Sequence, residues 1–317
     1  MPQVGCAGLL VEDTFCGPVA ALPPEGGLTV LNDMPVRAGG CAANVAIDLA
    51  KQGIDVDVVG CTGQDTAADV ITRTFHEHGV GMSRIVRVSN DETSKTVILL
   101  VEGQDRRYLH CVGANRAFSV DHVPTDWIAQ LKVFYLGGLF ALPGIDFAQL
   151  AALLKLCRQH DVATVVDVVT PQDLRDTSQL KPLLPLIDVF VPNDDEAKVF
   201  TGVTDPFDQL RKFRDGGANT VIITRGAQGS IASRDNNTWS CGTYYMKVVD
   251  PSGCGDAFTS GVIRSILMGW DLPQTLQYAS AVGASAARAA GTTQSVFSAA
   301  EAEAFVAANR ITVTHER

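Results

Sequence analysis

The sequence predicts an α/β fold in which helices cover both faces of a mostly parallel sheet, with a small β-sheet projecting from it. Apolar, β-branched runs alternate with amphipathic helical stretches along most of the 317 residues. Two β-rich sections, 14–37 and 94–112, interrupt this alternation, and their similar character suggests that they pair with each other. We therefore expect one domain over residues 1–317 with a β appendage built from those two sections.

In the first part of the chain, glycines and prolines separate short strands before regular alternation begins at residue 41. A helix is expected there, at 41–52, between the Gly39-Gly40 turn and Gly53. Residues 4–11 are interpreted as a first strand that ends at Glu12-Asp13. The other expected elements are strands at 28–31, 34–37 and 56–60, a helix at 66–78, and a hairpin of strands 96–101 and 107–112.

The second part continues the alternation to the end of the chain. We expect strands at 133–136, 163–168, 189–191, 220–224, 230–232 and 238–244, and helices at 147–159, 194–200, 206–214, 254–268, 273–290 and 299–309. Ligands bind beyond the carboxyl ends of the strands in such sheets. The candidate positions at these junctions are Asp13, Gly39-Gly40, 193–196, 226–229 and 250–256.

Composition excludes several classes of function. The formal net charge of −10 argues against a nucleic acid or an anionic membrane surface as a partner. The eight cysteines form no CxxC pair and no zinc-like spacing, so we interpret most of them as buried, reduced thiols. The start of the chain has no basic, apolar leader and no run reaches membrane-spanning length, so the expected location is cytoplasmic.

The common nucleotide and hydrolase motifs are missing. The sequence contains no GxxxxGK[ST], no complete GxGxxG, no GxSxG and no HExxH. A P-loop enzyme is therefore excluded, and an oxidoreductase with a dinucleotide site is disfavoured.

The most informative stretch is 248–261. Two β-branched residues end a strand, a turn with Gly253 and Gly255 follows, and Asp256 stands where an apolar helix begins. A helix start of this kind presents unpaired amides and favours an anion. Asp256 could act there as a general base, or it could be only an acid favoured by the helix dipole. The residues of this stretch alone leave both interpretations open.

Two motifs resemble signatures of the ribokinase-like carbohydrate kinases of the PfkB type. Asp250-Pro251-Ser252-Gly253-Cys254-Gly255-Asp256-Ala257-Phe258 resembles the family's C-terminal signature, and Gly39-Gly40-Cys41-Ala42-Ala43-Asn44-Val45-Ala46 resembles its N-terminal one. The resemblance covers essentially the whole chain. It implies a three-layer α/β/α sandwich with a small β-sheet lid, and transfer of the γ-phosphoryl group of ATP to a primary hydroxyl of a small carbohydrate.

The resemblance also implies roles for individual residues. Asp256 would be the catalytic base, and the amides of Gly253, Cys254 and Gly255 would form the anion hole. The implied sugar-binding residues are Asp13, Gly39, Gly40 and Asn44, with Arg106, Arg107 and Asn115 on the lid side. The implied nucleotide-binding residues are Asn193, Thr224, Gly226 and Gly229.

Implied metal positions complete this set. Glu196, with Asn193, would organise Mg²⁺, largely through water, and Asp250 and Ser252 would help to hold a monovalent cation such as K⁺, with carbonyls from 286–291. From the residues alone, Asn193 and Glu196 are equally explained as a helix cap, Asp13 as a turn residue and Asn44 as a packed helix polar group. The lid of the family closes over the sugar and often pairs with that of a second subunit, which predicts a homodimer.

The chain departs from the family pattern in three places. Cysteine stands at 254 where alanine is usual, and Pro251 removes one amide ahead of the anion hole. Cys41 stands where ribokinases tend to carry lysine, which weakens a strict ribose assignment and leaves fructose or another sugar open. A nucleoside kinase of the same fold, or a non-catalytic sugar-binding protein, are the alternatives.

Overall fold

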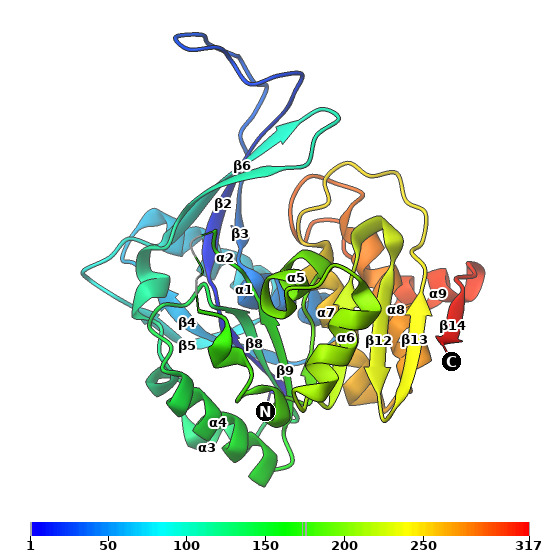
Figure 1. Cartoon of the computed structure of the whole chain (residues 1–317). Coiled ribbons are helices and arrows are strands. Elements are labelled where there is room, and N and C mark those ends of the chain that lie inside the picture. Colours follow the sequence, from blue (N-terminus) through cyan, green and yellow to red (C-terminus); the bar gives the residue numbers. More distant parts are fainter. Residues whose placement is uncertain (1, 173, 175, 317) are drawn as a thin grey trace.

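A ten-stranded sheet lies between two layers of helices, and a four-stranded sheet projects from one end of it (Figure 1). The computed structural model describes residues 2–172, 174 and 176–316. The strands of the large sheet, in spatial order, are β14 (Val313–Glu316), β13 (Asn237–Cys241), β12 (Ser230–Arg234), β11 (Thr220–Thr224), β10 (Val189–Phe190), β9 (Ala163–Val168), β8 (Val133–Leu139), β1 (Val4–Gly8), β4 (Val56–Thr62) and β5 (Gly81–Arg87). Strands β11 to β5 run parallel, and β12 to β14 form an antiparallel edge.

Helices cover both faces of this sheet, as the alternation of strands and helices predicts. They are α1 (Cys41–Lys51), α2 (Thr66–His78), α3 (Thr125–Ile128), α4 (Phe147–Gln159), α5 (Asp194–Thr201), α6 (Pro206–Asp215), α7 (Cys254–Met268), α8 (Leu272–Ala286) and α9 (Ala299–Ala308). Helices α3, α4 and α6 contribute to the core on one face, and α1, α2, α7 and α8 to the core on the other. The three-layer α/β/α prediction is confirmed.

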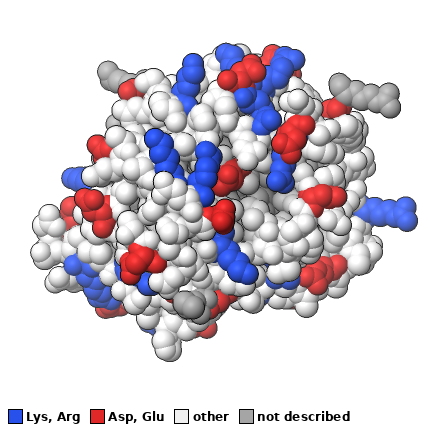
Figure 2. Space-filling view, turned by 90° about the horizontal axis from the view of Figure 1, so that it is seen from below, with Lys and Arg blue, Asp and Glu red and all other residues white. Residues whose placement is uncertain are grey.

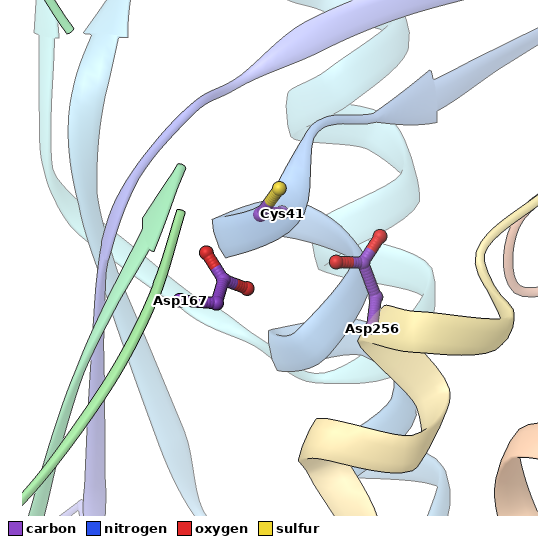
Figure 3. Close-up of side chains that lie close together, drawn as sticks. All are labelled: Cys41, Asp167 and Asp256. Atoms are coloured by element: carbon purple, nitrogen blue, oxygen red, sulfur yellow. The ribbon is translucent and has the colours of Figure 1, made fainter. Parts of the chain in front are cut away.

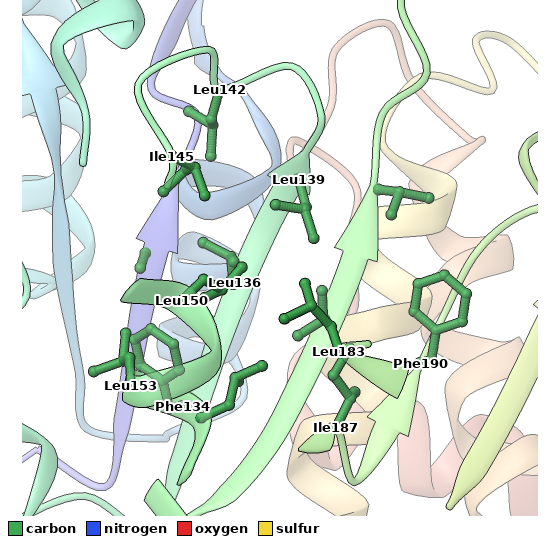
Figure 4. Packing of buried hydrophobic residues seen from close by; sticks show 14 of the residues in the cluster. Phe134, Leu136, Leu139, Leu142, Ile145, Leu150, Leu153, Leu183, Ile187 and Phe190 are labelled. Atoms are coloured by element: carbon green, nitrogen blue, oxygen red, sulfur yellow. The ribbon is translucent and has the colours of Figure 1, made fainter. Parts of the chain in front are cut away.

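Strand β8 shows how the sheet divides these two cores. Phe134 and Leu136 belong to the cluster that includes Leu150 and Leu153 of α4 (Figure 4). Their neighbours Val133 and Tyr135 belong to the cluster on the opposite face. Because successive side chains of a strand point to opposite faces, a strand buried on both sides must be apolar throughout. That requirement explains the continuous apolar runs of the central strands.

The projecting sheet, called the lid below, has the order β3-β2-β6-β7. Its strands are β2 (Val11–Val19), β3 (Val36–Gly39), β6 (Ser94–Val101) and β7 (Arg107–Cys111). Strand β2 pairs parallel with β6 and antiparallel with β3. The two β-rich sections therefore do pair with each other across the chain. A small core of Phe15, Ile98 and Leu100 holds them together.

Three expectations about the elements are wrong. Residues 4–11 form no single strand: β1 ends at Gly8 and β2 starts at Val11, because the Asn115 amide bonds both backbone groups of Leu10. Residues 28–31 form no strand, since Leu28 and Val30 are 89% and 84% exposed with nothing to pack on. The predicted set also omits the short helix α3, nearly all of strand β2 and the two edge strands β5 and β14, whose mixed composition carries no clear alternation.

Two further observations bear on the expected class of protein. None of the helices in the described ranges is long and apolar enough to cross a bilayer. All eight cysteines are free, and Cys6, Cys61, Cys157 and Cys241 are buried, whereas Cys111 is exposed. On the face shown in Figure 2, acidic and basic side chains are interspersed.

Candidate active site

The predicted site residues gather around the N-terminus of α7, at the carboxyl edge of the large sheet. Figure 3 shows Cys41 at the start of α1, Asp167 near the end of β9 and Asp256 at the start of α7, arranged around one small space. One ligand atom from each of these three side chains lies within 4.8 Å of the other two. The fold thus brings together three residues that come from distant segments of the sequence.

The start of α7 is shaped to present its amides. Gly253 is the residue before the helix and has a φ of 78°, and no side chain caps the helix there. A Cβ at position 253 would lie 2.1 Å from the carbonyl oxygen of Thr292, so only glycine fits. A Cβ at Gly255 would meet no atom within 4 Å, which shows that the first turn faces open space. An anion can therefore approach the first-turn amides, of which the Cys254 amide also donates to the Pro251 carbonyl at 3.4 Å.

Asp256 is held by a side-chain relay from α1. The Asn44 Nδ2 donates to Asp256 Oδ2 at 2.7 Å, and the Thr292 Oγ1 donates to Asn44 Oδ1 at 2.8 Å. Burial raises the pKa of Asp256, while hydrogen bonds from Asn44 and Cys41 and the positive charge of Arg106 lower it. These opposed effects leave a carboxylate that is oriented, poorly hydrated and capable of accepting a proton.

Asp13 lies on the lid side of the same space. It is the third residue of β2, not the end of a main-sheet strand, and is 6% exposed. A Cβ at Gly39 of the neighbouring β3 would stand 1.9 Å from Asp13 Oδ2, so glycine is needed to admit this carboxylate. Burial raises the pKa of Asp13 to about 7, a hydrogen bond from Thr96 opposes the rise, and the charge of Asp256 adds to it. Asp13 is thus a buried carboxyl group close enough to Asp256 for their charges to interact.

Sequence reasoning missed Asp167 and its partner Tyr135. The Tyr135 hydroxyl donates to Asp167 Oδ2, and the Gly138 amide donates to Asp167 Oδ1 at 2.5 Å. Burial and the charge of Asp256 raise the pKa of Asp167 well above its usual range. The only available signal was an acid interrupting the apolar run Val165-Val166-Asp167-Val168. Burial likewise raises the pKa of the Cys41 thiol well above its usual value, so the thiol is protonated.

Asn193 and Glu196 form a reciprocal helix cap at the start of α5. The Glu196 amide donates to Asn193 Oδ1 at 2.8 Å, and the Asn193 amide donates to Glu196 Oε2 at 2.9 Å. The capping interpretation therefore holds. Burial raises the pKa of Glu196 to about 7, the Asn193 amide opposes this, and the nearby charge of Asp256 adds to it. The capped Glu196 is therefore close enough to Asp256 for the charges of the two carboxyl groups to interact.

The turn after β11 lies beside this cap. Residue Thr224, at the end of β11, forms a β-bridge with Asn193. The turn is closed by Arg225, whose amide donates to the carbonyl of Gly229 at 2.8 Å. Gly226 faces open space, whereas a Cβ at Gly229 would lie 2.0 Å from the carbonyl oxygen of Cys241. The four predicted nucleotide-side residues, Asn193, Thr224, Gly226 and Gly229, are therefore neighbours.

Asp250 and Ser252 lie just ahead of α7, both buried. Asp250 Oδ1 accepts from the Ser252 amide at 2.9 Å, and Oδ2 accepts from the Gly291 amide at 3.0 Å. Within the described ranges, the buried Ser252 hydroxyl has no hydrogen-bond partner. A buried polar oxygen without a partner beside a carboxylate suits a cation.

The three residues predicted on the lid side have different surroundings. Arg106, in the turn between β6 and β7, donates to the Tyr108 hydroxyl and its charge lowers the pKa of Asp256. Arg107 is exposed and bonds Gln104 Oε1 at 2.6 Å. Both ends of the Asn115 amide bond Leu10, so Asn115 fixes the junction between β1 and β2. Of the three, only Arg106 exerts a charge on the site.

The chain is similar to known carbohydrate kinases. The family model described as pfkB family carbohydrate kinase matches residues 7–299. A ribokinase from Haemophilus influenzae is 26% identical over 256 residues, covering 78% of this chain and 80% of the relative. An ATP-dependent 6-phosphofructokinase from Thermoanaerobacterium thermosaccharolyticum is 26% identical over 251 residues, covering 78% and 77%.

Solved structures show the same fold. A ribokinase from Arabidopsis thaliana, complexed with ribose and ATP, superimposes with a TM-score of 0.81 at 22% identity, covering 96% of this chain and 98% of that one. The family model spans both the α1 start and the α7 start that meet in the site. The chain belongs to the pfkB family of carbohydrate kinases.

Proposed function

We propose that this kinase transfers the γ-phosphoryl group of ATP to a primary hydroxyl of a small carbohydrate, with Asp256 as general base. The observation that carries the proposal is the Asn44–Asp256 hydrogen bond at an open helix N-terminus, with Asp13 buried nearby. A carboxylate beside an anion site is repelled by a bound phosphate. Its presence is explained when it accepts the proton of the attacking hydroxyl.

The proposed step conserves protons and charge. The acceptor hydroxyl gives its proton to the Asp256 carboxylate, its oxygen attacks the γ-phosphorus, and ADP leaves. Negative charge on the transferred phosphoryl oxygens is met by the amides of Gly253, Cys254 and Gly255. The raised pKa of Asp256 makes it a better proton acceptor than an exposed aspartate.

The acceptor binds on the α1 and lid side in this scheme. Asp13 accepts hydroxyl hydrogens, the Gly39-Gly40 turn lets the sugar approach the backbone, and Asn44 orients Asp256. Asp167 and Cys41 line the same space. Burial raises the pKa of both groups and so favours their uncharged forms, which limits repulsion of the incoming phosphoryl group.

The nucleotide binds on the α5 and β11 side. The nucleotide site is lined by Thr224, Gly226 and Gly229. Mg²⁺ would be held by Asn193 and Glu196, largely through water. The fit rests on donor chemistry, because amide and carboxylate oxygens are the ligands that Mg²⁺ prefers. Burial is the main cause of the raised pKa of Glu196, and the negative charges of Asp256 and Asp195, which a cation would offset, add to it. When bound, Mg²⁺ neutralises charge on the phosphates.

A monovalent cation such as K⁺ would be held by Asp250 and Ser252, with carbonyls from 286–291. The unpartnered, buried Ser252 hydroxyl supports this assignment. The two amides that donate to Asp250 fix its carboxylate ahead of α7. A cation there would stabilise the turn that shapes the anion hole.

The lid is proposed to close over the acceptor and to contact a second copy of this chain. Leu28, Val30 and Leu109 are 89%, 84% and 63% exposed, and every residue of the edge strand β7 is exposed. An open sheet edge and exposed apolar residues each favour association with another chain. Sedimentation equilibrium should find a dimer in the wild type, and Leu28→Glu with Val30→Glu should shift it to monomer. A wild-type monomer at all concentrations contradicts this part.

The main test is Asp256→Asn, which keeps shape and removes the base. We expect kcat to fall by roughly 10²- to 10⁴-fold, with ATP binding retained. ADP release should be measured across pentoses, ketohexoses, sugar acids and nucleosides, with the exposed Asp126→Asn as control. Near wild-type turnover of a good acceptor by Asp256→Asn would refute the mechanism. A preference for nucleosides would instead correct the acceptor class.

A further inference from the structure

A second polar cavity lies outside the site described above, at the foot of the lid. It has a volume of about 640 Å³ and is lined by ten residues from β3, α1, α2 and the segment 293–294. Cavities of this size accommodate a small metabolite. It does not include any of the proposed catalytic, sugar-binding or nucleotide-binding residues.

The cavity is basic although the protein is acidic. Its lining includes three cationic residues, Arg37, Lys51 and Arg73, against Glu77 as the one acidic residue in that lining. It also includes His78. The chain as a whole carries 35 Asp and Glu against 25 Lys and Arg. Cations that converge on a cavity raise the local concentration of anions. The local excess of positive charge therefore selects an anionic ligand.

Two of these cations have no carboxylate partner. Among the described residues, neither Arg37 nor Arg73 forms an ion pair, and Arg37 donates only to the Val36 carbonyl, at 3.1 Å. Arginine presents several donors in a planar fork that matches phosphate oxygens. Two unpaired guanidinium groups lining one cavity are the arrangement that a phosphate group would neutralise.

Lys51 is placed differently from the arginines. Its ammonium donates to the carbonyl of Thr293, and Asp48 and Glu301 add negative charge around it. Burial and the Lys51 charge lower the pKa of His78, so His78 is neutral near pH 7 and serves as a hydrogen-bonding group. Lys51 consequently ties the inner wall of the cavity to the segment that follows Thr292.

That segment is shared with the active site. Thr292 donates to Asn44, which in turn holds Asp256, and the Gly291 amide donates to Asp250. The cavity also includes Arg37 of β3, a lid strand. A ligand that bridges Arg37 and Lys51 would therefore contact both the lid and the helix that carries Asn44.

We propose that this cavity binds a small phosphate-bearing anion, with Arg73 and Arg37 as its principal phosphate contacts and Lys51 at the inner wall. The side chains of Thr74 and Gln294 provide polar groups for the remainder of the ligand. Binding there orders residues 291–294, because Thr293 and Gln294 form part of the lining.

The binding test uses the full chain and two probes, inorganic phosphate and ribose 5-phosphate, titrated calorimetrically at constant ionic strength. Arg73→Gln should weaken binding about tenfold or more, since a charge-assisted contact is lost. Arg73→Lys should restore part of the affinity, and Arg211→Gln, an exposed arginine on α6, should match the wild type. Turnover without added phosphate should be unchanged in all three variants.

Hydrogen exchange supplies a second readout. Saturating phosphate should slow exchange at residues 291–294 in the wild type and not in Arg73→Gln. Equal affinity of both probes for the wild type and Arg73→Gln would place the phosphate at another anion site, such as the start of α7, and overturn the proposal. Absence of binding by both probes at millimolar concentration would overturn it too. These readouts do not depend on turnover, so the proposed kinase mechanism can fail independently.

Discussion

The proposed acceptor side and the proposed nucleotide side of the α7 N-terminus are built by different means. On the acceptor side, Asp13, Asn44 and Asp256 come from three distant segments and are held by contacts that span up to 248 residues of sequence. On the nucleotide side, Asn193 and Glu196 hold each other within four residues, and the 225–229 turn closes on itself. Asp13 and Asn44 are buried and Asp256 is partly exposed, whereas Asn193 and Gly226 are exposed.

This difference predicts how each side responds to change. Local caps and turns form wherever their residues occur, so substitutions on the nucleotide side should alter ligand binding with little loss of stability. Buried long-range polar contacts depend on the whole fold and carry the cost of burial. Substitutions on the acceptor side should therefore change stability and chemistry together. Four experiments test this contrast, in order of decreasing effect.

The largest effect is expected at the boundary between the two sides. Gly253→Ala forces a Cβ toward the Thr292 carbonyl at a φ of 78° and should cost about 3–5 kcal/mol of unfolding free energy. Gly255→Ala meets no atom within 4 Å and should leave stability unchanged or slightly higher. Thermal and urea unfolding measure both. Equal stability of the two variants would show that the 253 turn can relax.

Asp13→Asn should make the ligand-free protein more stable at alkaline pH. The folded-state pKa of Asp13 is about 7, above its unfolded value of 3.8, so its ionisation costs stability as pH rises through that window. The substitution should add about 2–4 kcal/mol at pH 8 and nothing near pH 4. Unfolding curves at several pH values measure this, with exposed Asp33→Asn as control. A gain that does not vary with pH would mean that Asp13 is not the ionising group.

Asn44→Ala removes the hydrogen bond that orients Asp256. Loss of a hydrogen bond to a charged group should lower kcat/KM for the acceptor by about 10- to 100-fold. Because the Asn44 bond lowers the pKa of Asp256, the acid limb of the kcat/KM profile should move to higher pH. The pH profile of Asn90→Ala, an exposed asparagine, serves as reference. A lower rate with an unmoved acid limb would reduce Asn44 to a packing residue.

The smallest change in stability is expected at Glu196. Glutamine can still accept the Asn193 amide, so Glu196→Gln should change unfolding free energy by less than about 0.5 kcal/mol. The half-saturating Mg²⁺ concentration should rise about tenfold, because the charge is lost. Glu196→Ala should additionally lose about 1 kcal/mol of cap stability. An unchanged Mg²⁺ requirement in Glu196→Gln would leave Glu196 with only its capping role.

Local signals account for what could be predicted. Helix α2 and helix α4 occur at the predicted residues, because each has an aspartate N-cap and an amphipathic period. The Asn193–Glu196 cap could be predicted for the same reason. Strand β14 could not, since only its pairing with β13 makes four mixed residues a strand. Asp167 was missed because a single acid in an apolar run gives no indication of its neighbours.

The alternation of strands and helices and the short motifs were sufficient to predict the layered α/β architecture, the pairing of the two β-rich sections and the helix start that carries Asp256. These features depend on sequence periodicity and on local backbone chemistry. Only the tertiary structure showed that Asp13 lies on a lid strand. It also showed the hydrogen bonds from Thr292 to Asn44 and from Asn44 to Asp256. The positions of Asp167 and Cys41 around the same space likewise came from the tertiary structure. The tertiary structure also brings together Arg37 and Arg73, which form no ion pair among the described residues, at the foot of the lid. Such contacts depend on how distant segments pack, and no local pattern encodes the neighbour that a buried side chain will meet.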